Sequence, residues 1–204
     1  MKSSPSYDTI EGIILAGGEN SRYDGKLKSK IIINDRPILA LMLDVLESVF
    51  STITLSTNSP AEFSDFEKIN KVSDKHKGIG PLGGIHAAMS QSSAEALFVI
   101  AGDMPYPSES LIRQMADYYL ACGCEILIPV YDERIEPLHA LYSNSLLKKL
   151  DHFLSRTRIY SIREFLKTSD VMYFDIGELG FDKAVFTNIN TPEDFDLLGL
   201  EKIN

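Results

Sequence analysis

The sequence predicts an α/β fold, in which a mostly parallel, twisted sheet carries helices on both faces and forms the middle of three layers. Short runs rich in β-branched and apolar residues alternate with segments whose apolar residues recur every three or four positions. These are the patterns of buried strands and of amphipathic helices. Residues 96–101 are all apolar, which is typical of a central strand that is covered on both sides. Because no repeat, low-complexity tract or linker divides the chain, we expect one domain over residues 1–204, with residues 1–8 as a flexible N-terminus.

The elements follow one another in the order that such a fold requires. Strands are predicted at residues 9–16, 31–33, 52–56, 69–72, 96–101, 126–131, 139–142, 171–175 and 185–187, the sixth and seventh as neighbours. Helices are predicted at residues 38–49, 84–92, 108–121, 145–154, 159–166 and 191–198, with a turn or short helix at 60–66. Ligands bind at the carboxyl ends of the strands in such sheets. The loops after residues 16, 72, 101 and 187 are therefore the places to search for a site.

Composition limits the classes of function. A net charge of −9 argues against a general nucleic-acid binder, which would need a broad basic face. No apolar run reaches the ~20 residues of a membrane-spanning helix, and the first residues lack the apolar segment of a signal peptide. Cys122 and Cys124 are too close in sequence for an easy disulfide and too few for a zinc site, so we expect small apolar side chains at a helix end, with a redox or metal role as the alternative. A cytoplasmic protein without membrane or nucleic-acid partners is expected.

The loop after the first strand is the most informative stretch. The apolar run ends at Leu15-Ala16-Gly17-Gly18, and four cations follow within nine positions: Arg22, Lys26, Lys28 and Lys30. Glycines allow backbone N–H groups to approach an anion closely, and the cations neutralise it. This local reversal of the overall charge suits a small polyphosphate ligand, although an ordinary solvated loop is an equal alternative. Neither a dinucleotide-binding Gly-x-Gly-x-x-Gly motif nor a Gly-x-x-x-x-Gly-Lys-Ser/Thr loop is present.

Asp103 directly follows the central apolar strand and should lie at the ligand-binding edge of the sheet. Carboxylate oxygens suit Mg²⁺, which usually takes one or two carboxylates together with substrate phosphates. Asp103 could instead cap the turn before Pro105, a common role for aspartate. The polyphosphate loop favours the metal, because bound phosphates would need one.

Other polar loops lie at the same predicted edge. The loop 74–84 holds more glycine than its connection requires, and Asn58 follows the strand at 52–56. Either could contact a base or ribose, or could be an ordinary turn. Thr191 and Pro192 make a strong helix start, which leaves Asn188 and Asn190 unexplained. His139 lies in an apolar strand, where a core histidine is expected rather than a catalytic base.

Taken together, these motifs resemble those of the molybdenum cofactor guanylyltransferases, the MobA family of nucleotidyltransferases with a Rossmann-like fold. Residues 15–18 with Arg22 and Lys28 resemble the family signature Leu-Ala-Gly-Gly-x-Ser-x-Arg-Met-Gly-x-Asp-Lys. Residues 32–38, 80–84, 102–105 and 188–193 resemble later family motifs in the same order. The resemblance spans nearly the whole chain.

The resemblance implies an enzyme that joins GMP from GTP to the phosphate of molybdopterin, releases pyrophosphate and uses Mg²⁺. The nucleotide would lie against Leu15, Ala16, Gly17, Gly18, Lys28, Asn58, Asp74 and Gly83. Arg22, Lys28 and Asp103 would act in catalysis, with Asp103 as the metal ligand, and Asn188 and Asn190 would face the pterin substrate. The resemblance also implies transient contact with molybdoenzymes or with proteins that insert the cofactor.

Two departures from the signature leave alternatives open. Tyr23-Asp24-Gly25 replaces the usual Met-Gly, and Leu27 stands where an aspartate normally precedes the lysine. The catalytic lysine could be Lys26, Lys28 or Lys30, of which register favours Lys28. The chain could also be a cytidylyltransferase of the same fold that acts on molybdopterin or on a sugar or isoprenoid phosphate. A non-catalytic nucleotide-binding relative is the third alternative.

Overall fold

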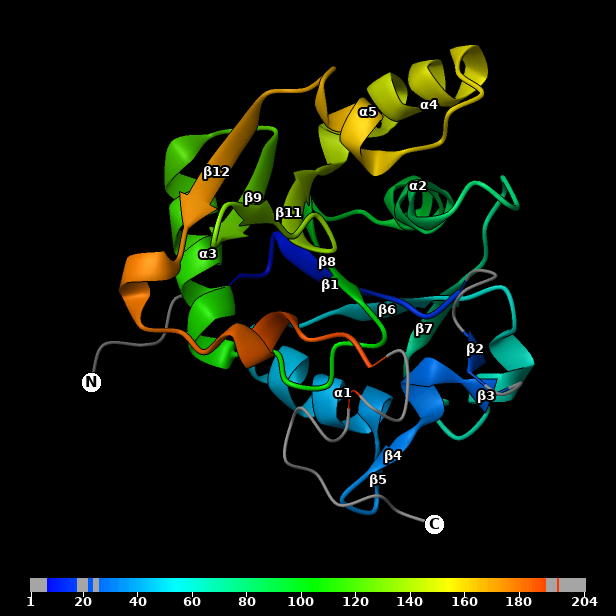
Figure 1. Ribbon diagram of the computed structural model, residues 1–204. Helices are drawn as coiled ribbons and strands as arrows, with labels where there is room; N and C mark the ends of the chain where they lie inside the picture. The colour runs from blue at the N-terminus through cyan, green and yellow to red at the C-terminus, as the bar shows by residue number, and fades with distance from the viewer. Residues whose placement is uncertain (1–6, 18–21, 24–25, 190–193, 195–204) are drawn as a thin grey trace.

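A central eight-stranded sheet organises the protein. The computed structural model describes residues 7–17, 22–23, 26–189 and 194. The sheet consists of β1 (Ile10–Leu15), β6 (Ile53–Ser56), β7 (Asn70–Val72), β8 (Ala96–Ala101), β9 (Ile126–Tyr131), β10 (Arg134–Ile135), β11 (His139–Ser143) and β12 (Val171–Asp175). Their order is β10-β9-β11-β8-β1-β6-β7, with β12 beside β9 (Figure 1). Two small hairpins, β2 (Arg22–Tyr23) with β3 (Lys26–Leu27) and β4 (Ile32–Ile33) with β5 (Arg36–Pro37), lie outside this sheet.

The sheet is mostly parallel, as predicted. β1 pairs in parallel with both β6 and β8, and β7 continues the parallel ladder beyond β6. β11 is antiparallel to β8 and also to β9, so the two strands predicted to be neighbours are paired. Consequently β8, β1, β6 and β7 all end at the same edge, and the loops that follow them meet there.

Helices cover both faces of the sheet. Figure 1 shows α2 (Pro81–Gln91), α4 (Leu147–Arg156) and α5 (Ile162–Leu166) on one side and α1 (Ile38–Val49) on the other. α3 (Glu109–Cys122) packs in the same core as α1. Alternate residues of β8 face the two layers: Phe98 and Ile100 join the core under α1 and α3, whereas Leu97 and Val99 join the core under α2, α4 and α5. Burial of both faces explains why the whole of β8 is apolar.

Most predicted elements are confirmed, with corrections at their ends. α2 begins at Pro81 rather than at residue 84, because proline is well placed in a first helical turn. α3 begins at Glu109, because the Ser108 hydroxyl caps it by accepting from the N–H of Leu111. α5 is shorter than the helix predicted at 159–166, and the helix predicted at 191–198 lies outside the described residues apart from Asp194.

The prediction of a strand at 185–187 is wrong. Residues Lys183–Phe186 form a short 3₁₀ helix instead. The Asp182 carboxylate accepts a hydrogen bond from the N–H of Ala184 and so starts a helical turn where the apolar residues alone indicated a strand. Asn188 therefore follows a helical turn beside the sheet and does not end a strand.

The cysteines lie at a helix end as expected, whereas the expectation for the N-terminal residues needs a correction at Tyr7. Cys122 ends α3, and Cys124 is buried with its thiol pKa raised by that burial to about 12. Tyr7, within the stretch predicted to be flexible, is buried, and its hydroxyl donates to Asp117 at 2.8 Å.

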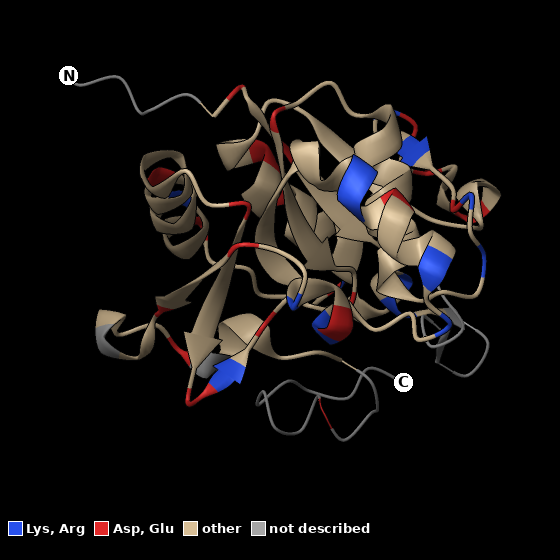
Figure 2. Ribbon diagram, turned by 90° about the horizontal axis from the view of Figure 1, so that it is seen from above, with Lys and Arg blue, Asp and Glu red and all other residues tan. Residues whose placement is uncertain are grey.

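No helix in the described part of the chain is long and apolar enough to cross a membrane. Figure 2 shows that Lys and Arg are scattered over several elements among Asp and Glu.

Candidate active site

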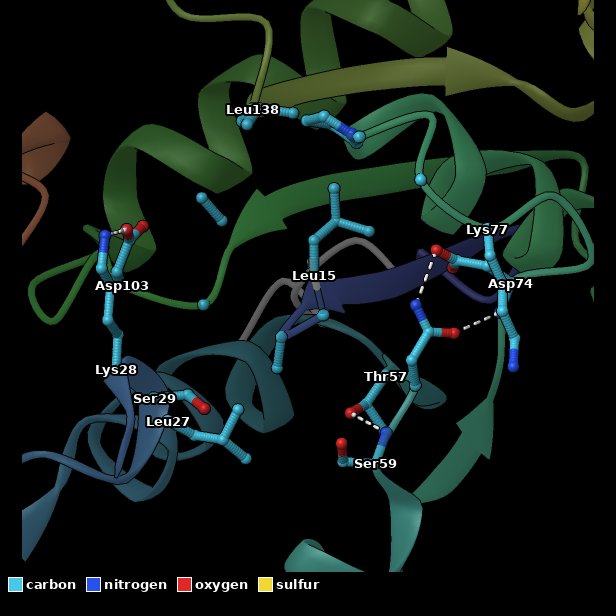
Figure 3. A pocket seen from close by; sticks show the side chains of 18 residues that line it. Leu15, Leu27, Lys28, Ser29, Thr57, Ser59, Asp74, Lys77, Asp103 and Leu138 are labelled. Atoms are coloured by element: carbon cyan, nitrogen blue, oxygen red, sulfur yellow. Dashed lines mark hydrogen bonds and ion pairs between the residues drawn. The ribbon is translucent and has the colours of Figure 1, made fainter. Parts of the chain in front are cut away.

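A cavity of about 620 Å³ lies where the parallel strands end. Its walls come from the loops after β1, β6, β7 and β8 and from the segment after β3 (Figure 3). Seven residues predicted from the sequence line it: Leu15, Ala16, Gly17, Lys28, Asn58, Asp74 and Asp103. The predicted residues therefore lie together at the carboxyl ends of the parallel strands, where ligands bind in sheets of this kind.

The end of β1 and the start of the loop after β8 form a closely packed part of the wall. The N–H of Gly102 donates to the carbonyl oxygen of Leu15 at 2.9 Å. A Cβ added at Gly102 would lie 2.9 Å from that oxygen and 3.3 Å from the Cα of Ala16. Glycine is thus required at this position by close approach of the backbone, and it sets the direction in which Asp103 leaves the sheet.

Asn58 and Asp74 form one wall of the cavity and hold each other in place. The Nδ2 of Asn58 donates to the Oδ2 of Asp74 at 2.9 Å, and the backbone N–H of Asp74 donates to the Oδ1 of Asn58 at 3.1 Å. The two residues follow β6 and β7, which are adjacent parallel strands. This reciprocal pair fixes both side chains before any ligand arrives.

Gly83 contributes to the same wall without lining the cavity. A Cβ added there would lie 3.0 Å from the Oδ2 of Asp74 and 3.0 Å from the carbonyl oxygen of His76. The space that glycine leaves open in α2 is occupied by the Asp74 carboxylate. The resemblance implies that Gly83 contacts the nucleotide, whereas the structure shows Gly83 packed against the Asp74 carboxylate.

Lys28 and Asp103 lie on the opposite side of the pocket from Asp74 (Figure 3). The Nζ of Lys28 is 3.6 Å from the Oδ2 of Asp103, and the two side chains are only 11% and 21% exposed. Burial raises the pKa of the Asp103 carboxyl above its ordinary value, and the Lys28 ammonium partly opposes that rise. The arrangement is an ion pair at the edge of a cavity.

The three candidate lysines differ in what they contact. Lys30 points away from the cavity, because its Nζ lies 3.2 Å from Asp65 and donates to the carbonyl oxygen of Glu62 at 2.5 Å. Lys28 lines the cavity. The side chains of Arg22 and Lys26 lie outside the described residues, as do Gly18 and Asn190.

Asn188 does not line the cavity but is tied to it. The next residue, Ile189, donates its backbone N–H to the carbonyl oxygen of Asp103 at 2.8 Å. The Oδ1 of Asn188 is buried and has no hydrogen-bond partner within the described part of the chain. An unpaired buried amide oxygen is uncommon and calls for an explanation such as a ligand or ion.

The residues at this site fit a magnesium ion held mainly by substrate. No group of three or more His, Cys, Asp or Glu among the described residues could hold a metal without other ligands. Mg²⁺ does not need such a group, because it keeps several waters and is commonly bound through one or two carboxylates plus phosphates. The Asp103 carboxylate can supply the first of these. The buried amide oxygen of Asn188 is a further hard donor, and it belongs to the residue next to Ile189, whose N–H binds the Asp103 carbonyl oxygen.

Several lining residues were not predicted. Thr57 and Ser59 line the cavity beside Asn58, and Thr57 Oγ1 accepts from the N–H of Ser59 at 3.1 Å. Ser29 and Lys77 also line it. The polar run that directly follows the strand at 52–56 was a usable signal, since the carboxyl end of a parallel strand faces the ligand. Lys77 was visible as a cation within the glycine-rich loop.

His139 is a core residue, as predicted. Its ring lies between those of Phe98 and Phe186, with centroid distances of 5.2 and 5.1 Å, and it is fully buried. Burial lowers its pKa to about 3, so the imidazole is neutral at physiological pH. The neighbouring Leu138 lines the cavity, whereas His139 does not.

Comparison with known proteins identifies the family of the chain. The family model described as the MobA-like NTP transferase domain matches residues 12–171. A probable molybdenum cofactor guanylyltransferase from Peptoclostridium acidaminophilum is 35% identical over 189 residues, which are 89% of this chain and 85% of that protein. A protein with the same description from Natranaerobius thermophilus is 30% identical, over 93% of this chain and 94% of its own length.

A solved structure extends the similarity to three dimensions. The crystal structure of molybdopterin-guanine dinucleotide biosynthesis protein A from Archaeoglobus fulgidus superposes with a TM-score of 0.77 at 26% identity, and the match covers 92% of this chain and 95% of that one. The resemblance of the sequence motifs is confirmed by these matches. The chain belongs to the family of MobA-like NTP transferase domains.

Proposed function

We propose that this protein is a molybdenum cofactor guanylyltransferase, which transfers GMP from GTP to the phosphate of molybdopterin and releases pyrophosphate. The observation that carries the proposal is a cavity that sets the Asn58–Asp74 pair opposite the Lys28–Asp103 ion pair. Relatives named molybdenum cofactor guanylyltransferase cover nearly the whole chain and support the choice of substrates. We further propose that residues 1–204 act as one nucleotidyltransferase domain.

The nucleotide is proposed to span the cavity between its two sides. Guanine offers N–H donors, and a carboxylate accepts hydrogen bonds at both oxygens, so the base is assigned to the side of Asp74 and Asn58. The phosphates are assigned to the side of Lys28, with the backbone of residues 15–17 between them. A volume of about 620 Å³ falls within the usual range for small-molecule sites.

The proposed chemistry is an in-line displacement. An oxygen of the molybdopterin phosphate forms a bond to the α-phosphorus of GTP, while the bond from that phosphorus to the bridging oxygen breaks and its electrons leave with pyrophosphate. The acceptor phosphate is already ionised near neutral pH, so no general base is required. This agrees with a neutral His139 that does not line the cavity.

The protein is proposed to contribute position and charge. Lys28, together with Arg22, would neutralise the negative charge that develops on pyrophosphate. Asp103 would hold Mg²⁺, with the Asn188 oxygen as a second candidate ligand. When bound, Mg²⁺ supplies Lewis-acid stabilisation of the transferring phosphate. A pterin-binding role for Asn188 and Asn190, the cytoplasmic location and the transient protein partners stay predictions.

One observation favours a second candidate function. Leu27 lines the cavity and is 3% exposed, at the position where the family signature has an aspartate. An apolar side chain cannot replace a carboxylate as a metal or hydrogen-bond partner. A nucleotide-binding protein that has lost turnover is therefore the alternative, and it predicts GTP binding without pyrophosphate release.

Asp103→Ala tests the proposed function. With GTP, Mg²⁺ and molybdopterin, we expect pyrophosphate release to fall at least about 100-fold, the usual effect of removing one group that stabilises the transition state. Asp65→Ala removes the same charge from an exposed residue outside the cavity and should retain activity. A thermal shift with GTP would show that the variant is folded. Undiminished turnover by Asp103→Ala would contradict the metal assignment.

A further inference from the structure

The Lys28–Asp103 ion pair occupies the position that a metal ion would need. The Nζ of Lys28 lies 3.6 Å from Asp103 Oδ2 at the wall of the cavity, and both side chains are largely shielded from solvent. Charges at this spacing in such an environment interact strongly, because screening by water is reduced. In the absence of ligand, the negative charge of Asp103 is therefore already balanced by a cation from the protein.

A divalent cation and this ammonium group cannot share the carboxylate without strong mutual repulsion. The other carboxylate that lines the cavity, Asp74, is held by Asn58 on the opposite side. Among the described residues that line the cavity, no second carboxylate lies on the side of Asp103 to offset the positive charge of an added metal ion. Metal binding at Asp103 requires that Lys28 be drawn to another anion.

A triphosphate is such an anion. Lys28 lines the cavity from the segment after β3, so its flexible side chain can turn from Asp103 toward a phosphate in the same cavity. The same phosphates would supply the oxygen ligands that Mg²⁺ takes from its substrate. One event thus removes the competing cation and adds ligands for the metal.

We propose that Lys28 acts as a placeholder cation at Asp103, which holds the metal site closed until the nucleotide binds. This inference rests on the proposed nucleotidyltransferase function and concerns the order in which the site fills. Free protein binds divalent cations weakly, and nucleotide strengthens metal binding partly by displacing Lys28. Because coupling between two ligands is reciprocal, metal strengthens nucleotide binding by the same factor.

The test measures Mn²⁺ binding to protein without nucleotide or acceptor, by the EPR signal of free Mn²⁺. Lys28→Met keeps the length of the side chain and removes the competing charge. We expect it to bind Mn²⁺ at least about tenfold more tightly than the unaltered protein. Adding Asp103→Asn to this variant should abolish the gain. Lys28→Gln serves as a second variant if Lys28→Met does not fold, and the same gain is expected.

Lys77→Met is the matched control, because Lys77 lines the same cavity and its loss changes the net charge equally. It should change Mn²⁺ affinity less than about twofold. Unchanged affinity in both Lys28 variants would overturn the proposal, and so would an equal gain in Lys77→Met, which would indicate a general effect of charge. A second arm with a GTP analogue that is methylene-bridged between its α- and β-phosphates should raise Mn²⁺ affinity more in the unaltered protein than in Lys28→Met.

The outcome is separable from that of the proposed function. Mn²⁺ binding without nucleotide needs no turnover, so a gain in Lys28→Met would support the placeholder even if the protein released no pyrophosphate from GTP. Conversely, normal guanylyl transfer with no gain in either Lys28 variant would leave the proposed function standing and remove the placeholder.

Discussion

The two sides of the cavity are built differently. On one side Asn58 and Asp74 are joined by two hydrogen bonds of 2.9 and 3.1 Å, and Gly83 leaves the space that the carboxylate fills. On the other side Lys28 and Asp103 approach to 3.6 Å, beyond ordinary hydrogen-bond length. The first pair is joined by two hydrogen bonds of ordinary length, and the second by an ion pair at a longer distance. This difference suits the proposed binding mode, in which the rigid base would lie against the fixed pair and the phosphates, whose charge changes during transfer, against groups that can exchange partners.

Lys28→Met should have the largest effect, and it acts on the side held by charge. We expect kcat/KM for pyrophosphate release to fall by about 10² to 10³, because the variant lacks a cation that stabilises the leaving group. The same variant is expected to bind Mn²⁺ more tightly without nucleotide, so binding and turnover should change in opposite directions.

Lys30→Met is the control for that prediction. Lys30 is paired with Asp65 away from the cavity, so its loss should leave kcat/KM within about twofold. Full activity of Lys28→Met would contradict the assignment and would shift the role to Lys26 or Arg22.

His139 lies outside the cavity and therefore serves as a reference for both of its sides. Its pKa is lowered to about 3 in the folded protein, against about 6.5 in an unfolded chain. Below pH 6.5 the His139 side chain takes up a proton in the unfolded chain but not in the folded protein. The free energy of unfolding is therefore unaffected by protonation of His139 well above pH 6.5 and decreases as the pH falls below it. Between pH 7 and pH 5 the loss should be about 2 kcal/mol.

Denaturant unfolding at several pH values checks this prediction. The free energy of unfolding of His139→Leu should depend less on pH over this range than that of the unaltered protein, while the pH dependence of turnover stays the same. Equal slopes in the two proteins would show that His139 is not held neutral. A changed pH–rate profile would place the histidine in the chemistry.

Gly83→Ala should have the smallest effect, on the side fixed by hydrogen bonds. The added methyl group would lie 3.0 Å from Asp74 Oδ2 and should move that carboxylate. We expect KM for GTP to rise about tenfold with little change in kcat, since base binding is weakened equally in the ground and transition states.

A double-mutant cycle checks the route of this effect. If Gly83 acts through Asp74, then Gly83→Ala and Asn58→Ala should be non-additive, because both disturb the same carboxylate. Ser90→Ala, farther along α2, should leave KM unchanged. Additive effects of the two variants would mean that Gly83 contacts the nucleotide independently of Asp74.

The sequence was sufficient to predict those site residues that directly follow the ends of apolar strands. β1 and β8 are distinct apolar runs, so the positions of Leu15 and Asp103 at one edge of the sheet could be predicted. Asn58 could be proposed from its position after the strand at 52–56, whereas the role of Asp74 came from the resemblance to the family. The structure supplies their mutual hydrogen bonds. Such a contact joins two loops 16 residues apart and leaves no local pattern in the sequence.

The remainder depends on contacts that no local pattern encodes. Lys28 and Lys30 are two positions apart, yet the 3₁₀ turn and the partner Asp65 direct Lys30 away from the cavity. Residues 185–187, with the apolar Val185 and Phe186, were predicted as a strand, but the cap from Asp182 makes a helical turn. The direction of β11 is likewise a property of pairing and not of composition.

The most direct test of the proposed function is pyrophosphate release by the unaltered protein with molybdopterin and Mg²⁺, compared among GTP, CTP, ATP and UTP. A site whose hydrogen-bonding groups are fixed for one base rejects others strongly. We expect release with GTP to exceed that with each other nucleotide by about 100-fold or more. Release that is greatest with CTP, or GTP binding without release, would contradict guanylyl transfer.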